Sequence, residues 1–311
     1  MINYLTYNEI DSNKWDECIR ASFNGNVYAY TWYLNIVCEN WEALVEDDYE
    51  RVFPLTTRKK FGINYLYQPF FTQQLGIFSK NILKKETVEK FINSIPEKYK
   101  FAEILLNTFN KIDKRKFIAT PQLNHELDLI SSYKILERHY SKNTKRNIKK
   151  AEKAGLKIIK NVKPDEIIEL FRNNRGKTVM TLKERNYTIL SRLIYAAIYR
   201  GIAQIYGAYT QNNQLCSAVV FIEGNKKAVF IFSGSNSEAR ENGAMPFLID
   251  AFIKDNSDKH LTLDFDGSND ENLARFYKGF GSKEVFYLKL EFNKLSGFAG
   301  QVLKVYKKMK A

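Results

Sequence analysis

Lys278 is the residue whose type and setting most clearly favour chemistry. It follows a predicted helix that ends at Tyr277, and Gly279 and Gly281 come directly after it. Glycines let a backbone approach a ligand closely. A lysine ammonium in such a place could stabilise the oxyanion that forms when an acyl group passes to an amine. We therefore predict Lys278 and Tyr277 as catalytic residues, with the alternative that Lys278 is only a cation favoured at a helix C-terminus.

The base that takes a proton from the attacking amine is harder to find. Asp264 and Asp266 stand at the end of a predicted strand, and either could act as a base or anchor the amine. We predict Asp266 as the third catalytic residue, with the alternative that it caps the following helix or the loop that leads to it. A reaction in which the substrate supplies the base would also fit. The three histidines show no partner pattern and are expected to be structural or solvated: His125, His139 and His260.

The densest positive charge lies on a predicted helix over 141–154, which ends at Gly155. Its cations follow three- and four-residue spacing and therefore share one face, whereas Ile148 and Ala151 can pack inward. Repulsion between these like charges destabilises the helix unless a bound anion neutralises them. This favours a phosphate-bearing partner over a merely solvated face. The predicted phosphate-binding residues are Lys142, Lys145, Arg146 and Lys149, and Lys150 and Lys153 continue the row.

Length and composition indicate two folded domains with a basic surface. The chain has 311 residues, of which 44% are hydrophobic and 14% aromatic, enough to fill two cores. The formal net charge of +13 attracts polyanions. The expected partners are transfer RNA, a nucleotide-linked substrate, coenzyme A or an anionic membrane face. A lysine-rich protein with an evenly basic surface would explain the charge equally well.

Several features predict a cytoplasmic protein without a transmembrane segment. No run of about 18 apolar residues is present, and Glu9 and Asp11 stand where a secretion signal would be apolar. The spacing of the cysteines suggests neither a disulfide framework nor a metal site, so no metal is expected. The oligomeric state stays open. The cysteines are Cys18, Cys38 and Cys216.

The order of the predicted elements indicates an α+β fold in two domains. The first domain, residues 1–130, mixes helices with strands over 42–46, 51–57 and 101–106. The second, residues 131–295, begins with the basic helix and has further helices over 165–173 and 186–200. An antiparallel meander over 202–233 is then followed by helix, strand, helix and strand. A last basic helix over 296–311 is predicted to pack on the first domain.

Three segments resemble the Fem-type aminoacyltransferases, the FemAB-like branch of the GNAT acyltransferases. The resemblance spans most of residues 20–290, and the second half has the GNAT order of elements. It implies two GNAT-like domains, each with a mixed, largely antiparallel sheet flanked by helices, and it implies that Lys278 lies near the reacting centre. The segments are the basic helix Ser141–Gly155, the strand and turn Leu263–Ser268, and Phe276–Gly281, which is similar to the family's aromatic-Lys-x-x-Phe-Gly signature; Gly25–Trp32 adds weaker support.

The GNAT resemblance also points to a loop that would bind the pyrophosphate of coenzyme A. In GNAT enzymes this loop reads Arg/Gln-x-x-Gly-x-Gly/Ala at a strand-to-helix junction, where free N–H groups attract phosphate. Here the matching segment runs from Arg240 to Met245, and Met245 breaks the pattern. Arg240 and Gly243 are nevertheless predicted phosphate-binding residues, and use of acetyl-CoA is in doubt.

Three functions remain open from the sequence. The first is an acyl- or aminoacyltransferase that forms an amide on an amine acceptor, with aminoacyl-tRNA as the candidate donor and a peptidoglycan precursor as the candidate acceptor. The second is a GNAT-type N-acetyltransferase that uses acetyl-CoA. The third is a basic module that binds polyanions without catalysis. No cofactor is expected beyond the acyl donor.

Overall fold

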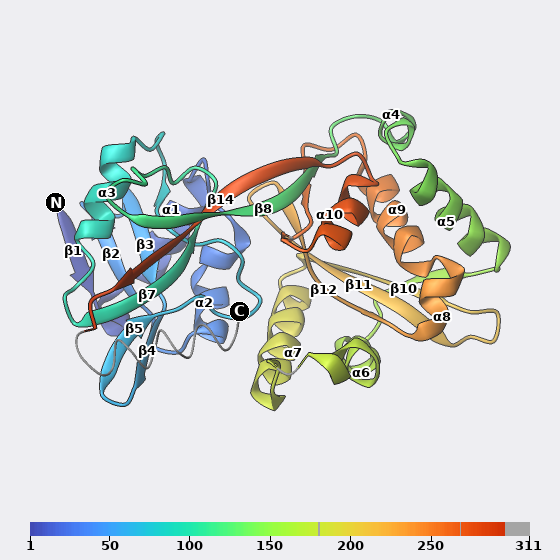
Figure 1. The fold of residues 1–311 in the computed structure, drawn as a ribbon, viewed down its shortest axis with the longest axis horizontal. Helices are drawn as coiled ribbons and strands as arrows, with labels where there is room; N and C mark the ends of the chain where they lie inside the picture. The colour runs from blue at the N-terminus through green and yellow to red at the C-terminus, as the bar shows by residue number, and fades with distance from the viewer. Residues whose placement is uncertain (180, 268, 296–311) are drawn as a thin grey trace. The chain divides into compact units, whose positions relative to one another are not determined.

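The computed structural model describes residues 1–179, 181–267 and 269–295 and divides them into two compact units (Figure 1). The first unit comprises Met1–Gln122 and the described residues from Phe286 onward, and the second is Leu123–Val285. The divisions predicted from the sequence lie at residues 130 and 295. The helix predicted over 296–311 lies outside the described residues.

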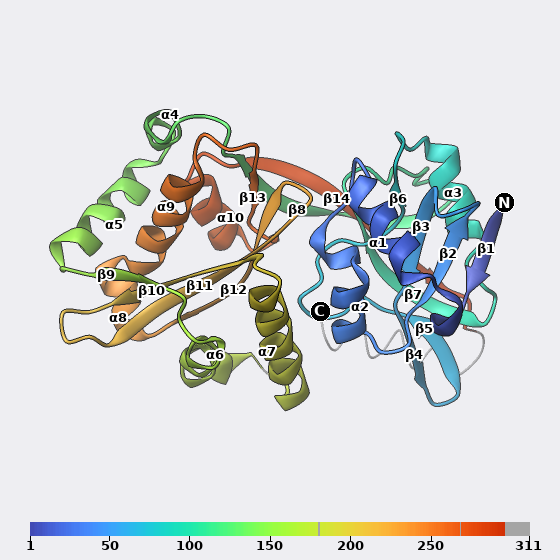
Figure 2. The ribbon, with the colours of Figure 1, turned by 180° about the vertical axis from the view of Figure 1, so that it is seen from behind.

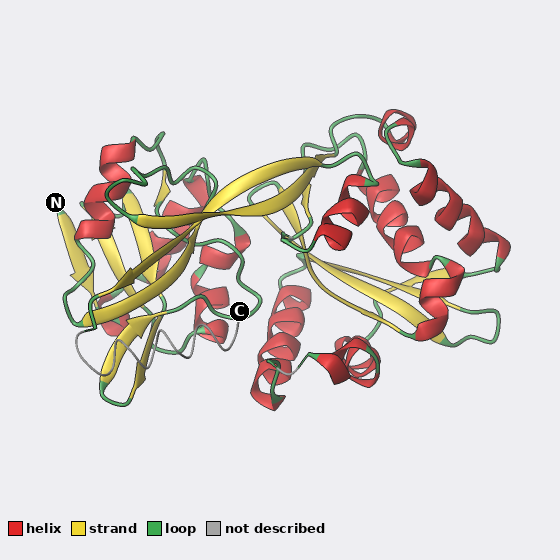
Figure 3. Ribbon diagram, viewed as in Figure 1, coloured by secondary structure: helices red, strands yellow, loops and turns green. Residues whose placement is uncertain are grey.

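The first unit contains two sheets with helices packed beside them (Figure 3). Phe53, Phe91 and Tyr99 are fully buried in its core. One sheet has the strand order β1-β2-β3-β6, and the second has the order β4-β5-β7-β14. The elements are β1 (Ile2–Leu5), α1 (Ser12–Ala21), α2 (Thr31–Val37), β2 (Glu42–Glu46), β3 (Arg51–Leu55), β4 (Thr57–Lys60), β5 (Ile63–Leu66), β6 (Phe78–Ser79), α3 (Lys85–Asn93), β7 (Tyr99–Leu106) and β14 (Lys283–Asn293).

The second unit has the strand order β8-β13-β12-β11-β10-β9. Each of the pairs β9–β10, β10–β11 and β11–β12 is antiparallel. Strands β12 and β13 run parallel, with Val229 opposite Asp264. Strand β8 is antiparallel to β13 and places Glu126 opposite Asp264. The strands are β8 (Ile118–Asp128), β9 (Lys157–Lys160), β10 (Ala203–Tyr209), β11 (Leu215–Gly224), β12 (Lys227–Ser235) and β13 (Thr262–Asp264).

Helices cover both faces of this second sheet (Figure 2). On one face, Phe252 of α9 stacks on Phe221 with ring centroids 3.8 Å apart. On the other, Phe171 of α6 lies 4.9 Å from Phe232. Strand β12 has a bulge between Phe230, which lies opposite Phe221, and Phe232, which lies opposite Val220. The extra residue turns the side chains of Phe230 and Phe232 to opposite faces of the sheet. The helices are α4 (Tyr133–Arg138), α5 (Lys142–Lys153), α6 (Pro164–Asn173), α7 (Glu184–Tyr199), α8 (Ser237–Asn242), α9 (Ala244–Asn256) and α10 (Glu271–Lys278).

The mixed α/β fold with mostly antiparallel sheets confirms the predicted fold class. The long helices and the meander lie where the periodicity indicated, and Ser141 caps α5, its side chain accepting from the N–H of Thr144. The short helices α4 and α8 and the strand β1 were not predicted. Among the described helices, none combines the length and apolar character needed to cross a bilayer.

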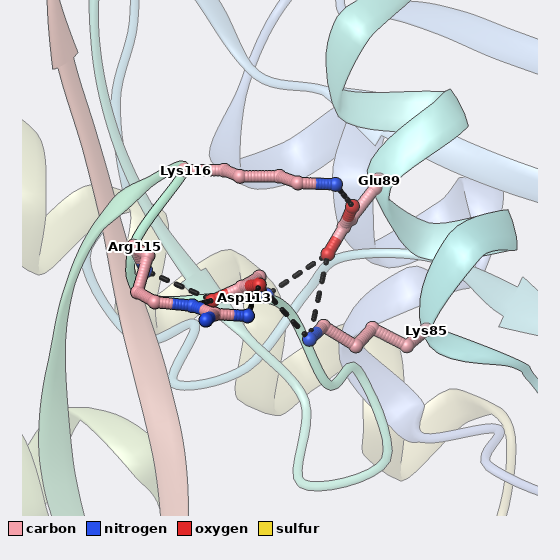
Figure 4. Close-up of polar contacts among 5 residues, drawn as sticks. All are labelled: Lys85, Glu89, Asp113, Arg115 and Lys116. Atoms are coloured by element: carbon pink, nitrogen blue, oxygen red, sulfur yellow. Dashed lines mark hydrogen bonds and ion pairs between the residues drawn. The ribbon is translucent and has the colours of Figure 1, made fainter.

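A group of charges in the first unit fixes α3 to the loop that precedes β8 (Figure 4). Glu89 is buried, and its carboxylate accepts from the N–H of Asp113 at 2.9 Å and from Lys116 at 3.3 Å. Lys85 lies 3.5 Å from Asp113. The hydrogen bonds from Arg115 hold the pKa of Asp113 well below its usual range. Each of these cations is therefore paired within the unit, unlike the cations of α5 described below.

Candidate active site

Lys278 is the last residue of α10, a helix that Asp270 caps through hydrogen bonds from Asn272 and Leu273. Asp270, rather than Asp266, is therefore the N-cap of this helix, and the alternative that Asp266 holds the preceding loop stays a prediction. The Lys278 side chain is 53% exposed, and its ammonium lies 2.5 Å from a carboxylate oxygen of Glu284 at the start of β14. A solvated ammonium at a helix end, close to a carboxylate, is available to a substrate that arrives from solvent.

Tyr277 faces the opposite way from Lys278 and packs in the core of the second unit. Its ring stacks on Phe265 at 4.6 Å and lies 6.1 Å from the ring of His125. Burial, reinforced by the charges of Asp266 and Asp264, raises the pKa of the Tyr277 phenol. The phenol therefore stays neutral at physiological pH, and the packing of its ring fixes the orientation of the helix turn that carries Lys278.

The two glycines after Lys278 are needed for contact with another segment of the protein. A β-carbon at Gly279 would lie 2.5 Å from the hydroxyl of Thr144, and one at Gly281 would lie 2.8 Å from the β-carbon of His139. Gly281 also has φ +80°, which favours glycine. The N–H of Ser141 donates to the carbonyl of Gly279 at 2.8 Å. The space that we assigned to a ligand in the sequence is therefore filled by the segment that starts α5.

The basic helix α5 consequently begins beside Lys278. Thr144, Ile148 and Ala151 are its buried residues, which confirms the predicted inward side for Ile148 and Ala151. Among the described residues, no cation of α5 forms an ion pair; Arg146 donates only to the amide oxygen of Asn143. The cations on the opposite side are exposed or half-buried: Lys142, Lys145, Arg146, Lys149, Lys150 and Lys153.

The carboxylates at the end of β13 are held by neighbours on the adjacent strands. Asp264 is buried and accepts from the side-chain amide of Asn124 at 2.8 Å and from the N–H of Asp266 at 2.9 Å. Lys227 lies 2.5 Å from Glu126 and 3.7 Å from Asp264. Asp266 follows the strand with φ +59° and is half-buried. Its charge reaches Tyr277, so the structure brings the three predicted catalytic residues into one corner of the second unit.

His125 belongs to the same corner, although no partner was predicted for it. It is fully buried on β8; its Nδ1 lies 3.3 Å from the hydroxyl of Ser282, and its Nε2 has no hydrogen-bond partner in the described part of the chain. Burial lowers the pKa of His125, the negative charge of Glu284 raises it in part, and the positive charge of Lys278 lowers it. The imidazole is therefore neutral at physiological pH and supports the turn after α10 from below.

Arg240 and Gly243 lie in a setting that does not suit the pyrophosphate of coenzyme A. Arg240 is exposed on α8, and Gly243 joins α8 to α9 with φ +78°. A β-carbon at Gly243 would lie 2.3 Å from the carbonyl of Asn147 on α5, so this glycine permits close helix packing. The predicted strand-to-helix junction is a helix-to-helix junction.

The first turn of α9 also offers few free donors to a phosphate. The N–H of Ala244 already donates to the side chain of Asn242 at 3.1 Å, and Pro246 has no N–H to offer. Phosphate binding at a helix N-terminus depends on these free N–H groups. The residues present do not fit coenzyme A at this helix.

The overall fold is similar to those of several solved structures. The fold matches FemX with a TM-score of 0.63 at 12% identity, covering 92% of this chain and 96% of that one. The chain has a fold like that of FemX. L-PGS from Bacillus licheniformis shares it with a TM-score of 0.54 at 10% identity, over 96% of each chain. So does the C-terminal domain of a putative lysylphosphatidylglycerol synthetase from Agrobacterium fabrum, with a TM-score of 0.55 at 10% identity over 94% of each chain.

Sequence comparison adds no closer relative. No family model matches the chain, and no curated protein gives a significant match. The Fem-like fold is therefore recognised through its architecture and through the three segments that meet around Lys278.

We expect Gly281→Ala to destabilise the second unit by more than Gly201→Ala. Both glycines have positive φ, +80° and +67°, which a residue with a β-carbon adopts at a cost of about 1–2 kcal/mol. Only Gly281 would also clash with His139, whereas Gly201 has open space around it. Urea unfolding of both variants measures the difference. Equal losses of unfolding free energy would contradict the close contact between the turn and the start of α5.

We expect His125 to make the stability of the protein depend on pH. Because folding lowers the pKa of His125, the unfolded chain binds more protons once the pH falls below about 6.5. The stabilising contribution of neutral His125 is complete above that pH and is lost as the pH falls towards the folded-state pKa. His125→Gln should therefore flatten the dependence of the unfolding free energy between about pH 7.5 and 5. The exposed His260, changed to Gln, is the control and should leave the slope unchanged.

Proposed function

We propose that this protein is an acyl- or aminoacyltransferase that forms an amide on an amine acceptor and takes its acyl group from an aminoacyl-tRNA. One observation carries the proposal: the hydrogen bond from Ser141 to Gly279 joins the start of the basic helix to the residue after Lys278. Helix α5 has 12 residues and is about 18 Å long. A phosphate backbone lying along α5 would bring one of its ends to the Lys278 ammonium.

Lys278 supplies the charge that such a reaction needs. The attacking amine and the ester carbonyl form a tetrahedral intermediate with a negative oxygen, which a fixed cation stabilises. The exposed ammonium of Lys278 can reach a substrate, whereas the buried phenol of Tyr277 holds the helix turn in place. Asp266 adds negative charge beside Tyr277 and could attract the ammonium form of the acceptor.

The distribution of phosphate-binding groups favours a tRNA over acetyl-CoA as the donor. Six cations that have no acidic partner within the described part of the chain line α5, and lysines bind a phosphate backbone as point charges. The start of α9, where a GNAT enzyme would hold coenzyme A, is closed by Asn242 and Pro246. The net charge of +13 would also steer a large polyanion to the protein.

The acceptor that we propose is an amine on a nucleotide-linked cell-wall precursor in the cytoplasm. The Fem-like fold supports acyl or aminoacyl transfer in general, since the proteins that share it include FemX and proteins named for the synthesis of lysylphosphatidylglycerol. The last name describes an aminoacylated lipid, so a membrane-bound amine or hydroxyl acceptor is the natural second substrate to assay.

The test is transfer of a radiolabelled amino acid from bulk charged tRNA to cell-wall precursors, with labelled acetyl-CoA as the second donor. We expect transfer from charged tRNA, and a loss of about 10²–10³-fold in kcat for Lys278→Ala because the oxyanion loses its cation. The exposed Lys283→Ala, in the same turn, should keep its activity. Transfer from acetyl-CoA alone would contradict the proposed donor, and a fully active Lys278→Ala would contradict the role of Lys278.

A further inference from the structure

Glu284 is the exposed carboxylate that lies against Lys278. Its side chain is 38% exposed, and its Oε1 is 2.5 Å from the Lys278 ammonium. The turn that joins them is held by hydrogen bonds from Phe280 to the carbonyl of Tyr277 and from Gly281 to that of Lys278, the latter at 2.9 Å. Phe280 is fully buried and anchors the turn in the core. The packed turn therefore fixes the spacing between the carboxylate and the ammonium.

Other acidic groups of this corner already have structural partners. Asp264 is buried and accepts from Asn124 and from a backbone N–H, and Glu126 pairs with Lys227. Asp270 accepts the first N–H groups of α10. His125 is enclosed, so its free Nε2 is out of reach of a substrate. Asp266 is half-buried after β13, and its charge acts on the buried phenol of Tyr277. Among the acidic groups at this corner, Glu284 combines exposure with a described ion pair to Lys278.

We propose that Glu284 is the general base of the transfer reaction, an inference that rests on the proposed function. The amine nitrogen attacks the ester carbonyl, a C–N bond forms, and the carbonyl oxygen becomes an oxyanion held by Lys278. Glu284 then takes the proton from the attacking nitrogen. The C–O bond of the ester breaks, and Glu284 returns that proton to the leaving oxygen, so that an ester and an amine give an amide and an alcohol.

The geometry allows Lys278 to serve both partners together. An ammonium has three donors, so one can hold Glu284 while a second binds the oxyanion. This places the base next to the oxyanion, where the attacking nitrogen must also be. Hydrogen bonding from Lys278 lowers the pKa of Glu284 and keeps the carboxylate ionised at neutral pH, although it also makes it a weaker base. The proton that Glu284 takes therefore comes from the attacking nitrogen after the C–N bond has formed, when that nitrogen carries a positive charge and is acidic. Lys278 and His125 are the titratable groups that act on Glu284 in the described part of the chain.

The experiment compares Glu284→Gln with wild type in the charged-tRNA assay, with cell-wall precursors and with glycinamide as a simple amine. The glutamine keeps a hydrogen-bond acceptor for Lys278 but takes no proton. We expect kcat to fall by about 10²–10⁴-fold with little change in KM for the donor. The deficit should shrink as the pH rises, because hydroxide replaces the missing base. Glu184→Gln, which removes the exposed Arg172–Glu184 pair, is the matched control and should behave as wild type.

The outcomes separate this inference from the proposed function. If wild type is active, Lys278→Ala is inactive and Glu284→Gln is as active as wild type, the general-base role is overturned while the transferase stands. If Glu284→Gln is faster than wild type, Glu284 restrains Lys278 and the inference is likewise overturned. If wild type transfers from neither donor to either acceptor, the proposed function fails and this inference fails with it. An unchanged melting temperature of Glu284→Gln excludes unfolding as the cause of a loss.

Discussion

The contact between the start of α5 and the turn after α10 is the constraint on which the candidate site depends. The N–H of Ser141 donates to Gly279, and the absence of side chains at Gly279 and Gly281 lets His139 and Thr144 approach. Segments separated by more than a hundred residues in sequence are thereby joined backbone to backbone. The contact fixes Lys278 at one end of a row of cations and sets Glu284 against it.

Electrostatics explains why this arrangement indicates a function. Like charges along one helix face repel each other, and α5 is retained as a helix because Ile148 and Ala151 pack on the core and Gly243 lets α9 approach. In the first unit, by contrast, the cations around Glu89 and Asp113 are paired with carboxylates (Figure 4). The cations of α5 have no such ion pairs among the described residues, and their density along one helix face is the basis for the proposal that this surface binds a polyanion.

Much of the fold and part of the site follow from the sequence. Helices such as α5 and α7 extend over several turns and reveal their period, and the meander is marked by turn residues between apolar runs. Helices α4 and α8 have six residues each, too few for a period to show. Lys278 and the basic row could be named because their types and spacing are local properties of the chain.

The remaining parts of the site depend on contacts between distant segments. The glycines at 279 and 281 indicate that another group lies close to this stretch of backbone. The fold shows that this group is the segment at the start of α5 rather than a ligand. His125 stands in an ordinary strand pattern, and its burial comes from α10. Glu284 looks like a polar residue at the start of a strand until the turn brings it to Lys278. The prediction of a strand-to-helix junction at Gly243 was wrong because the short helix α8 lies between strand β12 and this glycine.

Photo-crosslinking tests whether a tRNA donor lies along α5 with its reactive end at Lys278. A photoreactive benzoylphenylalanine is placed at Lys278 in one variant and at Lys153, the last residue of α5, in another, and each is irradiated with tRNA. If the donor lies this way, we expect crosslinks from position 278 to the 3′-terminal nucleotide and from position 153 to nucleotides further into the acceptor stem. Crosslinks in the reverse order, or none from either position, would contradict it.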